Sequence, residues 1–308
     1  MTGSVTEPLA VIDCGSNSTR LLIASRAGAT LVREMRITRL SAGVDVTATL
    51  GVEARERTYD ALAHYRALMD EHHVERGLLV ATSAVRDAAN ARDFLERAEE
   101  ITGVPSRVLS GEEEAEFTYA GATRGLAADP RATVVLDIGG GSTEIAVRRD
   151  GLHSYSMQLG CVRVSERALG TDVVTPVGVA ATRAMIDEEL DRAWAAVPCL
   201  SEVAGAARLV GVAGTVSTLA QLDAHRHDYD RAAVHHRVLS RAVVAHWRDL
   251  LGALTPPQRL ELPGMVRGRE DVLVAGLYIL DAVMGRLGVE ELLSSEDDIL
   301  DGVAASLL

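Results

Sequence analysis

The sequence predicts an α/β protein built from two similar halves, and three observations support this prediction. Strand and helix signals alternate through residues 9–125 and again from residue 132 onward, which is the pattern of α/β folds. A loop motif near the N-terminus returns 124 residues later, at roughly the spacing of one domain. The length of 308 residues suits two domains with buried cores.

Composition and charge exclude some classes of partner. Aromatic residues make up only 3% of the chain, so Val, Leu, Ile and Ala must fill the core, and stacking surfaces for single-stranded nucleic acid are not expected. The formal net charge of −13 predicts that the average surface repels duplex DNA. A few backbone N–H groups and arginines can still bind a small polyanion. We therefore expect no nucleic-acid partner.

The cysteines and the hydropathy pattern predict a cytoplasmic protein without a membrane partner. Cys14, Cys161 and Cys199 are widely spaced and form no Cys-x-x-Cys pair, which fits a reducing compartment. No apolar run reaches the length of a membrane span, and residues 1–8 do not resemble a signal peptide. At Cys14 and Cys161, which lie near the proposed loops, we expect small buried thiols rather than redox groups.

The repeated motif predicts two β-hairpins with phosphate-binding turns. Residues 11–22 (VIDCGSNSTRLL) align with residues 135–146 (VLDIGGGSTEIA). Each copy reads as an apolar strand, an Asp, a turn of small residues, Ser-Thr, a charge and a second apolar strand. Small residues let successive N–H groups form a concave nest for phosphate oxygens. An Asp beside such a nest repels phosphate unless a cation lies between them, so each Asp is a candidate Mg²⁺ ligand.

A purely structural turn is the alternative interpretation of each loop. One such loop alone is weak support for phosphate binding, because small residues are also what any tight turn requires. Two loops in matching register favour the functional interpretation.

Helix and strand signals place the other elements of the first half. We expect, in order, a helix at 53–72, a strand at 77–81, a helix at 90–103, a strand at 105–109 and a helix at 110–124. Asn90 and Gly103 are the expected N-cap and C-terminal stop of the second helix. Ser110 and Glu113 have the spacing of a capping box, and Gly125 is expected to end the helix that they open.

The second half repeats this alternation and then becomes mainly helical. We expect a tight turn at 150–151, a long helix at 175–197, a strand at 207–212, a helix from 214 and a strand at 291–294 within the helical region 240–308. The strand, small-residue loop and helix start at 210–217 form a third anion-site candidate. We place the domain boundary between 125 and 126, and the last helix can pack back on the first domain.

Seven stretches of the chain occur in the order of a known family. They are IDCGSNS at 12–18, ATSAVRDAAN at 81–90, SGEEEA at 110–115, DIGGGSTE at 137–144, LGCV at 159–162, GVAGT at 211–215 and REDVLVAG at 269–276. By these stretches the chain resembles the exopolyphosphatase and guanosine pentaphosphate phosphatase (Ppx/GppA) family, within the superfamily of sugar kinases, actin and heat-shock chaperones. The resemblance implies two ribonuclease H-like, actin-like domains with an interdomain cleft. The sequence matches the short two-domain form, without the additional helical domains of longer members.

The resemblance also implies roles for individual residues. Glu114 matches the family's catalytic glutamate, expected to deprotonate or orient the attacking water. Asp137 and Glu144 match the carboxylates that hold Mg²⁺, with Mn²⁺ as an alternative. The residues expected to bind phosphate are Asn17, Ser18, Arg86, Gly139, Gly140, Gly141, Ser142, Thr143, Gly214, Thr215 and Arg269. The implied reaction is Mg²⁺-dependent release of terminal orthophosphate from inorganic polyphosphate or guanosine pentaphosphate, and a homodimer is the family's habit.

Three other interpretations stay open at this point. An ATP-dependent kinase of the same superfamily shares both phosphate loops, but the stretch at 110–115 gives no reason to expect an acceptor. A sensor that binds polyphosphate or guanosine polyphosphates without turnover is disfavoured by the presence of Glu114, Asp137 and Glu144. The histidines and aspartates at 225–236 lack regular ligand spacing, so a polar surface loop is expected there rather than a transition-metal site.

Overall fold

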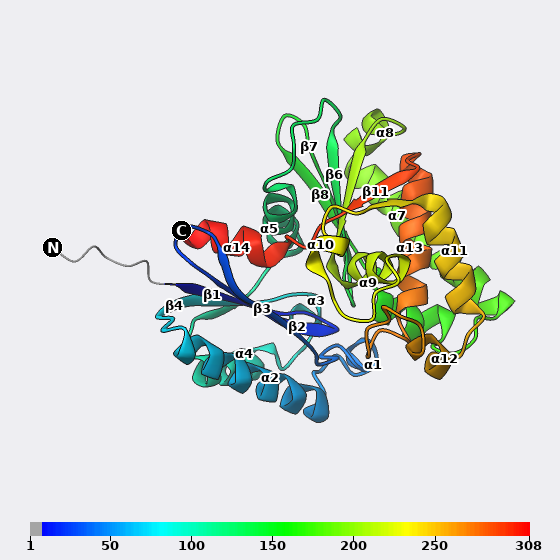
Figure 1. The fold of residues 1–308 in the computed structure, drawn as a ribbon. Coiled ribbons are helices and arrows are strands. Elements are labelled where there is room, and N and C mark those ends of the chain that lie inside the picture. The colour runs from blue at the N-terminus through cyan, green and yellow to red at the C-terminus, as the bar shows by residue number, and fades with distance from the viewer. Residues whose placement is uncertain (1–7) are drawn as a thin grey trace. The chain divides into compact units, whose positions relative to one another are not determined.

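A computed structural model describes residues 8–308 and divides the chain into two compact units (Figure 1). Unit 1 comprises Met1–Gly121 and Ile299–Leu308, and unit 2 comprises Ala122–Asp298. The final helix therefore belongs to unit 1, and the domain boundary after residue 125 stays a prediction about folding units. Of the N-terminal segment considered for a signal peptide, residues 1–7 lie outside the described range.

Unit 1 is built on a five-stranded mixed sheet in the order β3-β2-β1-β4-β5. The strands are β1 (Leu9–Cys14), β2 (Ser18–Ala24), β3 (Thr30–Ile37), β4 (Arg76–Ala81) and β5 (Ser106–Val108). The first three strands pair antiparallel, whereas β4 and β5 join in parallel. Strand β1 is buried along its whole length, because alternate residues enter apolar clusters on opposite faces of the sheet.

Helices cover both faces of this sheet. They are α1 (Val44–Thr47), α2 (Val52–Glu71), α3 (Ser83–Arg86), α4 (Ala91–Thr102), α5 (Gly111–Thr123) and α14 (Ile299–Leu307). Helix α2 packs against α4 over one face, and α14 packs on β1 and β2 over the other (Figure 1). A Cβ atom at Gly302 would lie 1.9 Å from the carbonyl oxygen of Phe117, so a glycine is required where α14 meets α5.

The predicted helix caps of unit 1 are confirmed in two cases and wrong in one. Ser110 and Glu113 form the capping box, with Glu113 N donating to Ser110 Oγ at 3.1 Å and Ser110 N to the Glu113 carboxylate at 3.0 Å. Gly103 ends α4 with a φ of +69°. Asn90 precedes α4, but its side chain accepts from Leu50 N at 2.9 Å and caps no helix. The Asn90 side-chain amide instead makes its hydrogen bonds with the backbone of Leu50, 40 residues away.

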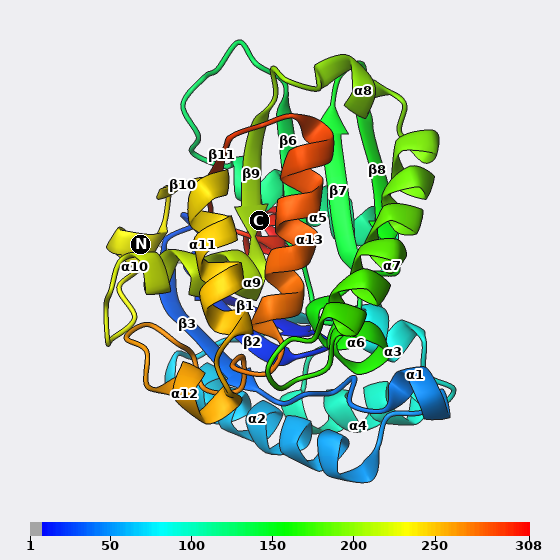
Figure 2. The same ribbon diagram turned by 90° about the vertical axis from the view of Figure 1, so that its right-hand side faces the viewer.

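Unit 2 contains a six-stranded sheet in the order β10-β11-β9-β6-β7-β8 (Figure 2). The strands are β6 (Thr133–Ile138), β7 (Thr143–Arg148), β8 (Leu152–Met157), β9 (Arg208–Val212), β10 (Val238–Ser240) and β11 (Glu291–Ser294). When β10 is set aside, both sheets have the same order of third, second, first, fourth and fifth strand. This is the ribonuclease H-like order, and it confirms the prediction of an α/β fold with two similar halves.

The helices of unit 2 agree with the predicted helical character of the C-terminal third. They are α6 (Cys161–Val164), α7 (Pro176–Ala196), α8 (Cys199–Val203), α9 (Ala213–Asp223), α10 (Arg231–Val234), α11 (Arg241–Gly252), α12 (Pro256–Leu260) and α13 (Leu273–Leu287), with a π-helical turn η1 (Ser165–Leu169). Helix α13 lies against the sheet and fills much of the unit's apolar core (Figure 2). Within residues 8–308, no helix combines the length and the apolar character that crossing a membrane requires.

Candidate active site

The two repeated hairpins fold alike within their own units. In unit 1, Gly15 N donates to Ser18 O at 3.0 Å, and in unit 2 the equivalent bond joins Gly139 N to Ser142 O at 3.0 Å. Both turns follow a buried strand whose last residues include the motif's Asp. The internal repeat therefore encodes one local structure twice, and it presents the loop residues at equivalent places on the two sheets.

The carbonyl groups of the unit 2 loop all point to neighbouring donors. The backbone N–H groups of residues 161–163 donate to Gly139 O and Gly140 O at 2.9 to 3.1 Å. Arg163 Nε donates to Gly141 O at 2.6 Å. Because the oxygen and hydrogen of a trans peptide point in opposite directions, the N–H groups of residues 140–142 point away from these donors. Within residues 8–308 no backbone carbonyl accepts from those three amides, so they can bind an anion.

The unit 1 loop follows the same scheme with a different backing segment. Ser41 N donates to Ser16 O at 2.9 Å, and the amides of residues 38 and 39 donate to Asn17 O at 3.1 and 2.9 Å. The Asn17 side chain is buried, and neither its oxygen nor its nitrogen has a hydrogen-bond partner in the described part of the chain. Such a group costs roughly 1–3 kcal/mol unless a ligand or water satisfies it. This orphaned amide supports Asn17 as a phosphate-binding residue.

A pair of buried carboxylates lies beside the unit 2 loop. Asp137 and Glu144 are direct partners across β6 and β7 and are only 6% and 2% exposed. Ser156 on β8 donates its hydroxyl to Glu144 at 2.6 Å. Like charges directly opposite on a sheet destabilise it, and a hard divalent cation would relieve the repulsion, since Mg²⁺ prefers one or two carboxylates together with phosphate oxygens and water. This donor set therefore fits Mg²⁺.

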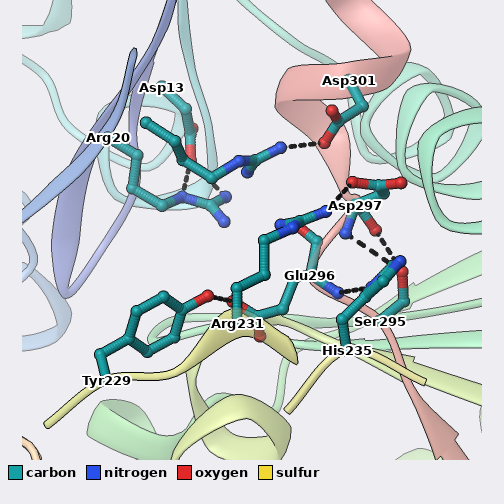
Figure 3. A network of polar contacts seen from close by, with 10 residues as sticks. Asp13, Arg20, Tyr229, Arg231, His235, Ser295, Glu296, Asp297 and Asp301 are labelled. Atoms are coloured by element: carbon teal, nitrogen blue, oxygen red, sulfur yellow. Dashed lines mark hydrogen bonds and ion pairs between the residues drawn. The ribbon is translucent and has the colours of Figure 1, made fainter. Parts of the chain in front are cut away.

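In unit 1 the equivalent aspartate already has a cation. Arg20, which stands where unit 2 has Glu144, donates to one oxygen of Asp13 through Nε at 3.0 Å and Nη2 at 2.6 Å (Figure 3). Because this ion pair already supplies a positive charge to Asp13, the expectation of a Mg²⁺ ligand is stronger for Asp137 than for Asp13, where it stays a prediction. Of the two copies, only the one in unit 2 sets two carboxylates opposite each other.

Glu114 lies in the first turn of α5, in unit 1. It is 6% exposed, and Arg86 Nη1 contacts its carboxylate at 3.2 Å while also donating to Leu109 O at 2.8 Å. The predicted catalytic residue and a predicted phosphate-binding arginine are thus direct neighbours. Arg86 fixes the orientation of the carboxylate and brings a positive charge to it. Ser83 in the same α3 segment links to Ser16 of the unit 1 loop through a 3.0 Å hydroxyl contact.

The remaining predicted residues of unit 2 meet around one buried thiol. A Cβ atom at Gly214 would lie 1.1 Å from Arg269 Nη1, so the guanidinium rests directly on the glycine backbone. Burial raises the pKa of Cys161 to about 11, although the nearby Arg269 and a hydrogen bond with Thr215 lower it. Since Cys161 N also binds Gly139 O, this cysteine connects the glycine loop to the other residues. The expectation of a small buried thiol is confirmed.

Two contacts of the site were missed by sequence reasoning. The Arg163 side chain binds the glycine loop from 22 residues further along the chain, and no local pattern indicates this. Ser156 could have been found, because the predicted turn at 150–151 folds β8 back along β7 and sets Ser156 opposite Glu144. The register of a hairpin follows from the position of its turn.

The histidine-rich segment at 225–236 has local structural roles. Asp230 caps α10 by accepting from Ala232 N at 3.0 Å. His235 Nδ1 accepts from Glu296 N at 3.0 Å (Figure 3). The rings of His235 and His236 stack with centroids 3.8 Å apart. In the described part of the chain, no group of three His, Cys, Asp or Glu side chains could hold a metal ion. The structure thus gives no support to a transition-metal site in this segment.

Comparison with known proteins identifies the family of the chain. The sequence profile of the Ppx/GppA phosphatase family matches residues 21–308. The chain belongs to this family. Exopolyphosphatase 2 of Mycobacterium tuberculosis is 40% identical over 318 residues, covering 97% of this chain and 98% of that protein. The match extends over nearly the full length of both chains.

Solved Ppx/GppA structures have the same fold over nearly the whole chain. An exopolyphosphatase-like protein superposes with a TM-score of 0.90 at 33% identity, covering 98% of this chain and 100% of that one. The PPX-GPPA enzyme of Aquifex aeolicus has a TM-score of 0.78 at 30% identity, with 97% and 99% coverage. An exopolyphosphatase from Cytophaga hutchinsonii has a TM-score of 0.85 at 26% identity, with 98% and 97% coverage.

The contact between Gly214 and Arg269 leads to a testable prediction. In Gly214→Ala the new methyl group must displace the guanidinium, while the fold gains helix propensity of up to about 1 kcal/mol because the residue lies in the first turn of α9. We expect an unchanged or raised Tm together with a KM for polyphosphate that rises by about 10-fold. Steady-state kinetics and thermal unfolding check the two effects.

A double variant tests whether Gly214 acts through Arg269. If it does, Gly214→Ala combined with Arg269→Ala should have the KM of Arg269→Ala alone, because the two changes remove one interaction. Additive effects of the two substitutions would show that Gly214 has a separate role.

Proposed function

We propose that this protein is an exopolyphosphatase, a Mg²⁺-dependent phosphoanhydride hydrolase that releases terminal orthophosphate from inorganic polyphosphate. Guanosine pentaphosphate ends in the same kind of anhydride and is a second candidate substrate. Family membership and the resemblance to exopolyphosphatases support the reaction class.

The observation that carries this proposal is that the buried carboxylates of Asp137 and Glu144 lie opposite each other, next to three loop amides that donate to no backbone carbonyl within residues 8–308. A backbone nest binds phosphate oxygens, and a divalent cation on the carboxylates neutralises the charge that phosphate brings. Mg²⁺ bound there would withdraw charge from the phosphoryl oxygens and align the terminal group. Thr143 begins β7 directly after the loop, and its buried hydroxyl has no hydrogen-bond partner in the described residues, which supports it as a further donor to phosphate.

The protein's own groups then carry the hydrolytic step. Glu114 orients the attacking water and accepts its proton, while Arg86 holds the carboxylate and offers its guanidinium to phosphate. Phosphoryl transfer depends on alignment and charge neutralisation more than on covalent catalysis, so one base, two arginines and the amide nest supply what the reaction needs. The proposed base belongs to unit 1 and the carboxylate pair to unit 2.

Phosphate release measured side by side from short polyphosphate, long polyphosphate and guanosine pentaphosphate tests this function. We expect Mg²⁺-dependent release of orthophosphate that a chelator abolishes and added Mg²⁺ restores. Binding of these ligands by calorimetry without any phosphate release would instead identify a sensor. Transfer of phosphate from ATP to an acceptor would identify a kinase. Size-exclusion chromatography with light scattering in the same preparation tests the predicted homodimer.

A further inference from the structure

Three successive carbonyls of the unit 2 glycine loop accept hydrogen bonds, and one of the three accepts from a side chain. The Gly139 and Gly140 carbonyls accept from the backbone amides of residues 161–163. These bonds do not depend on which side chains residues 161–163 carry. The Gly141 carbonyl accepts instead from the Nε of Arg163, at 2.6 Å. Arg163 is 9% exposed and lies in α6, in the same segment whose backbone amides bind the loop.

The close fit of the backing segment shows that the loop has little room to move toward it. A Cβ atom at Gly160 would lie 2.1 Å from Gly140 O, so two stretches of backbone are in direct contact there. Three successive glycines nevertheless allow peptide rotation that other residues resist. The orientation of each peptide therefore depends on the hydrogen bond that its carbonyl makes.

In the unit 1 loop, backbone amides make the hydrogen bond that the Arg163 side chain makes in unit 2. The residue equivalent to Gly141 is Asn17, and its carbonyl accepts from two backbone amides, those of residues 38 and 39. In unit 2 the same peptide is held by the Arg163 guanidinium. Because this peptide also carries the N–H of the following serine, the direction of Ser142 N–H is set by Arg163.

We propose that Arg163 is a positioning residue for phosphate: its guanidinium fixes the Gly141–Ser142 peptide so that Ser142 N–H donates to a phosphoryl oxygen. The inference rests on the proposed function of this loop as the phosphate site. It assigns to Arg163 no contact with the reacting atoms. The buried positive charge behind the loop adds to its attraction for an anion.

Substitution of Arg163 by Met and by Lys tests this role. Arg163→Met keeps much of the volume and removes all donors, so we expect the KM for polyphosphate and the Kd for tripolyphosphate to rise about 10-fold or more, with kcat changed by less than about threefold. Arg163→Lys retains one cationic donor and should recover part of the lost affinity. Arg167→Met is the matched control, because it removes an equal charge from an exposed position four residues further on.

The outcomes separate positioning from a structural role. A folded Arg163→Met protein with a Kd for tripolyphosphate within about twofold of the wild type overturns the proposal. Loss of cooperative unfolding in both Arg163→Met and Arg163→Lys also overturns the proposal, since Arg163 would then be required for the fold itself. A weakened Kd in Arg163→Met, with Arg167→Met unchanged and Arg163→Lys intermediate, supports it. Calorimetry needs no turnover, so absence of phosphate release by the wild type would contradict the proposed function without deciding this inference.

Discussion

Replacement of Glu114 by Gln should lower kcat by about 10² to 10⁴-fold while leaving the Kd for tripolyphosphate within about threefold of the wild type. The amide has the shape of the carboxylate and can still accept from Arg86, which contacts Glu114 at 3.2 Å. It cannot accept a proton from water. The loss should therefore fall on the chemical step, and single-turnover phosphate release beside calorimetry measures the two effects separately.

Glu112→Gln provides the control for this experiment. Glu112 lies in the same first turn of α5 but is exposed, so its substitution removes an equal charge near the helix N-terminus without touching the buried site. We expect turnover within about twofold of the wild type and a stability change of less than about 1 kcal/mol. Turnover by Glu114→Gln at the level of this control would exclude Glu114 as the general base.

Asp137→Asn should affect catalysis and stability in opposite directions. Loss of one carboxylate weakens the proposed cation site, so we expect at least a 10-fold higher Mg²⁺ concentration for half-maximal turnover, or about 10²-fold lower kcat/KM at fixed Mg²⁺. In the presence of a chelator, the same change removes a buried like-charge pair with Glu144. The free energy of unfolding should then rise by up to about 1 kcal/mol.

Asp13→Asn gives the opposite stability result because its partner is a cation. Arg20 would lose a charged acceptor held at 2.6 Å, and we expect the free energy of unfolding to fall by about 1–3 kcal/mol, with or without Mg²⁺. Thermal unfolding of both variants in chelator and in Mg²⁺ distinguishes the two hairpins. A fall in stability for Asp137→Asn in chelator would contradict the assignment of the metal to the unit 2 pair.

Local sequence was sufficient to predict the elements that carry the site. The hairpins, the capping box at Ser110 and Glu113, and the strand β11 all depend on residues close together in the chain, so propensity and spacing describe them well. Asn90 shows where this reasoning fails. Its Asx-type side chain fits a helix cap, yet Leu50, 40 residues away, takes its hydrogen bonds.

The candidate site shows the same division. The repeat and the family resemblance selected the residues of both loops, and the structure brings together those of each unit: Glu114 with Arg86, and Gly214 with Arg269. The support behind each loop could not be predicted. Arg163 lies in a later segment and donates to the peptide carbonyl of Gly141. Every residue has such a carbonyl, so the sequence of the loop does not indicate that this contact is made.

The sequence by itself determined that a hairpin with a small-residue turn is made twice, because hydrophobic alternation and turn chemistry act over a few neighbouring positions. Only the tertiary structure decided how the two copies differ. The charge opposite the repeated Asp is Arg20 in one and Glu144 in the other. Burial and strand pairing make this difference matter for stability, because they remove the charges from water and set them opposite each other, which strengthens the interaction between them.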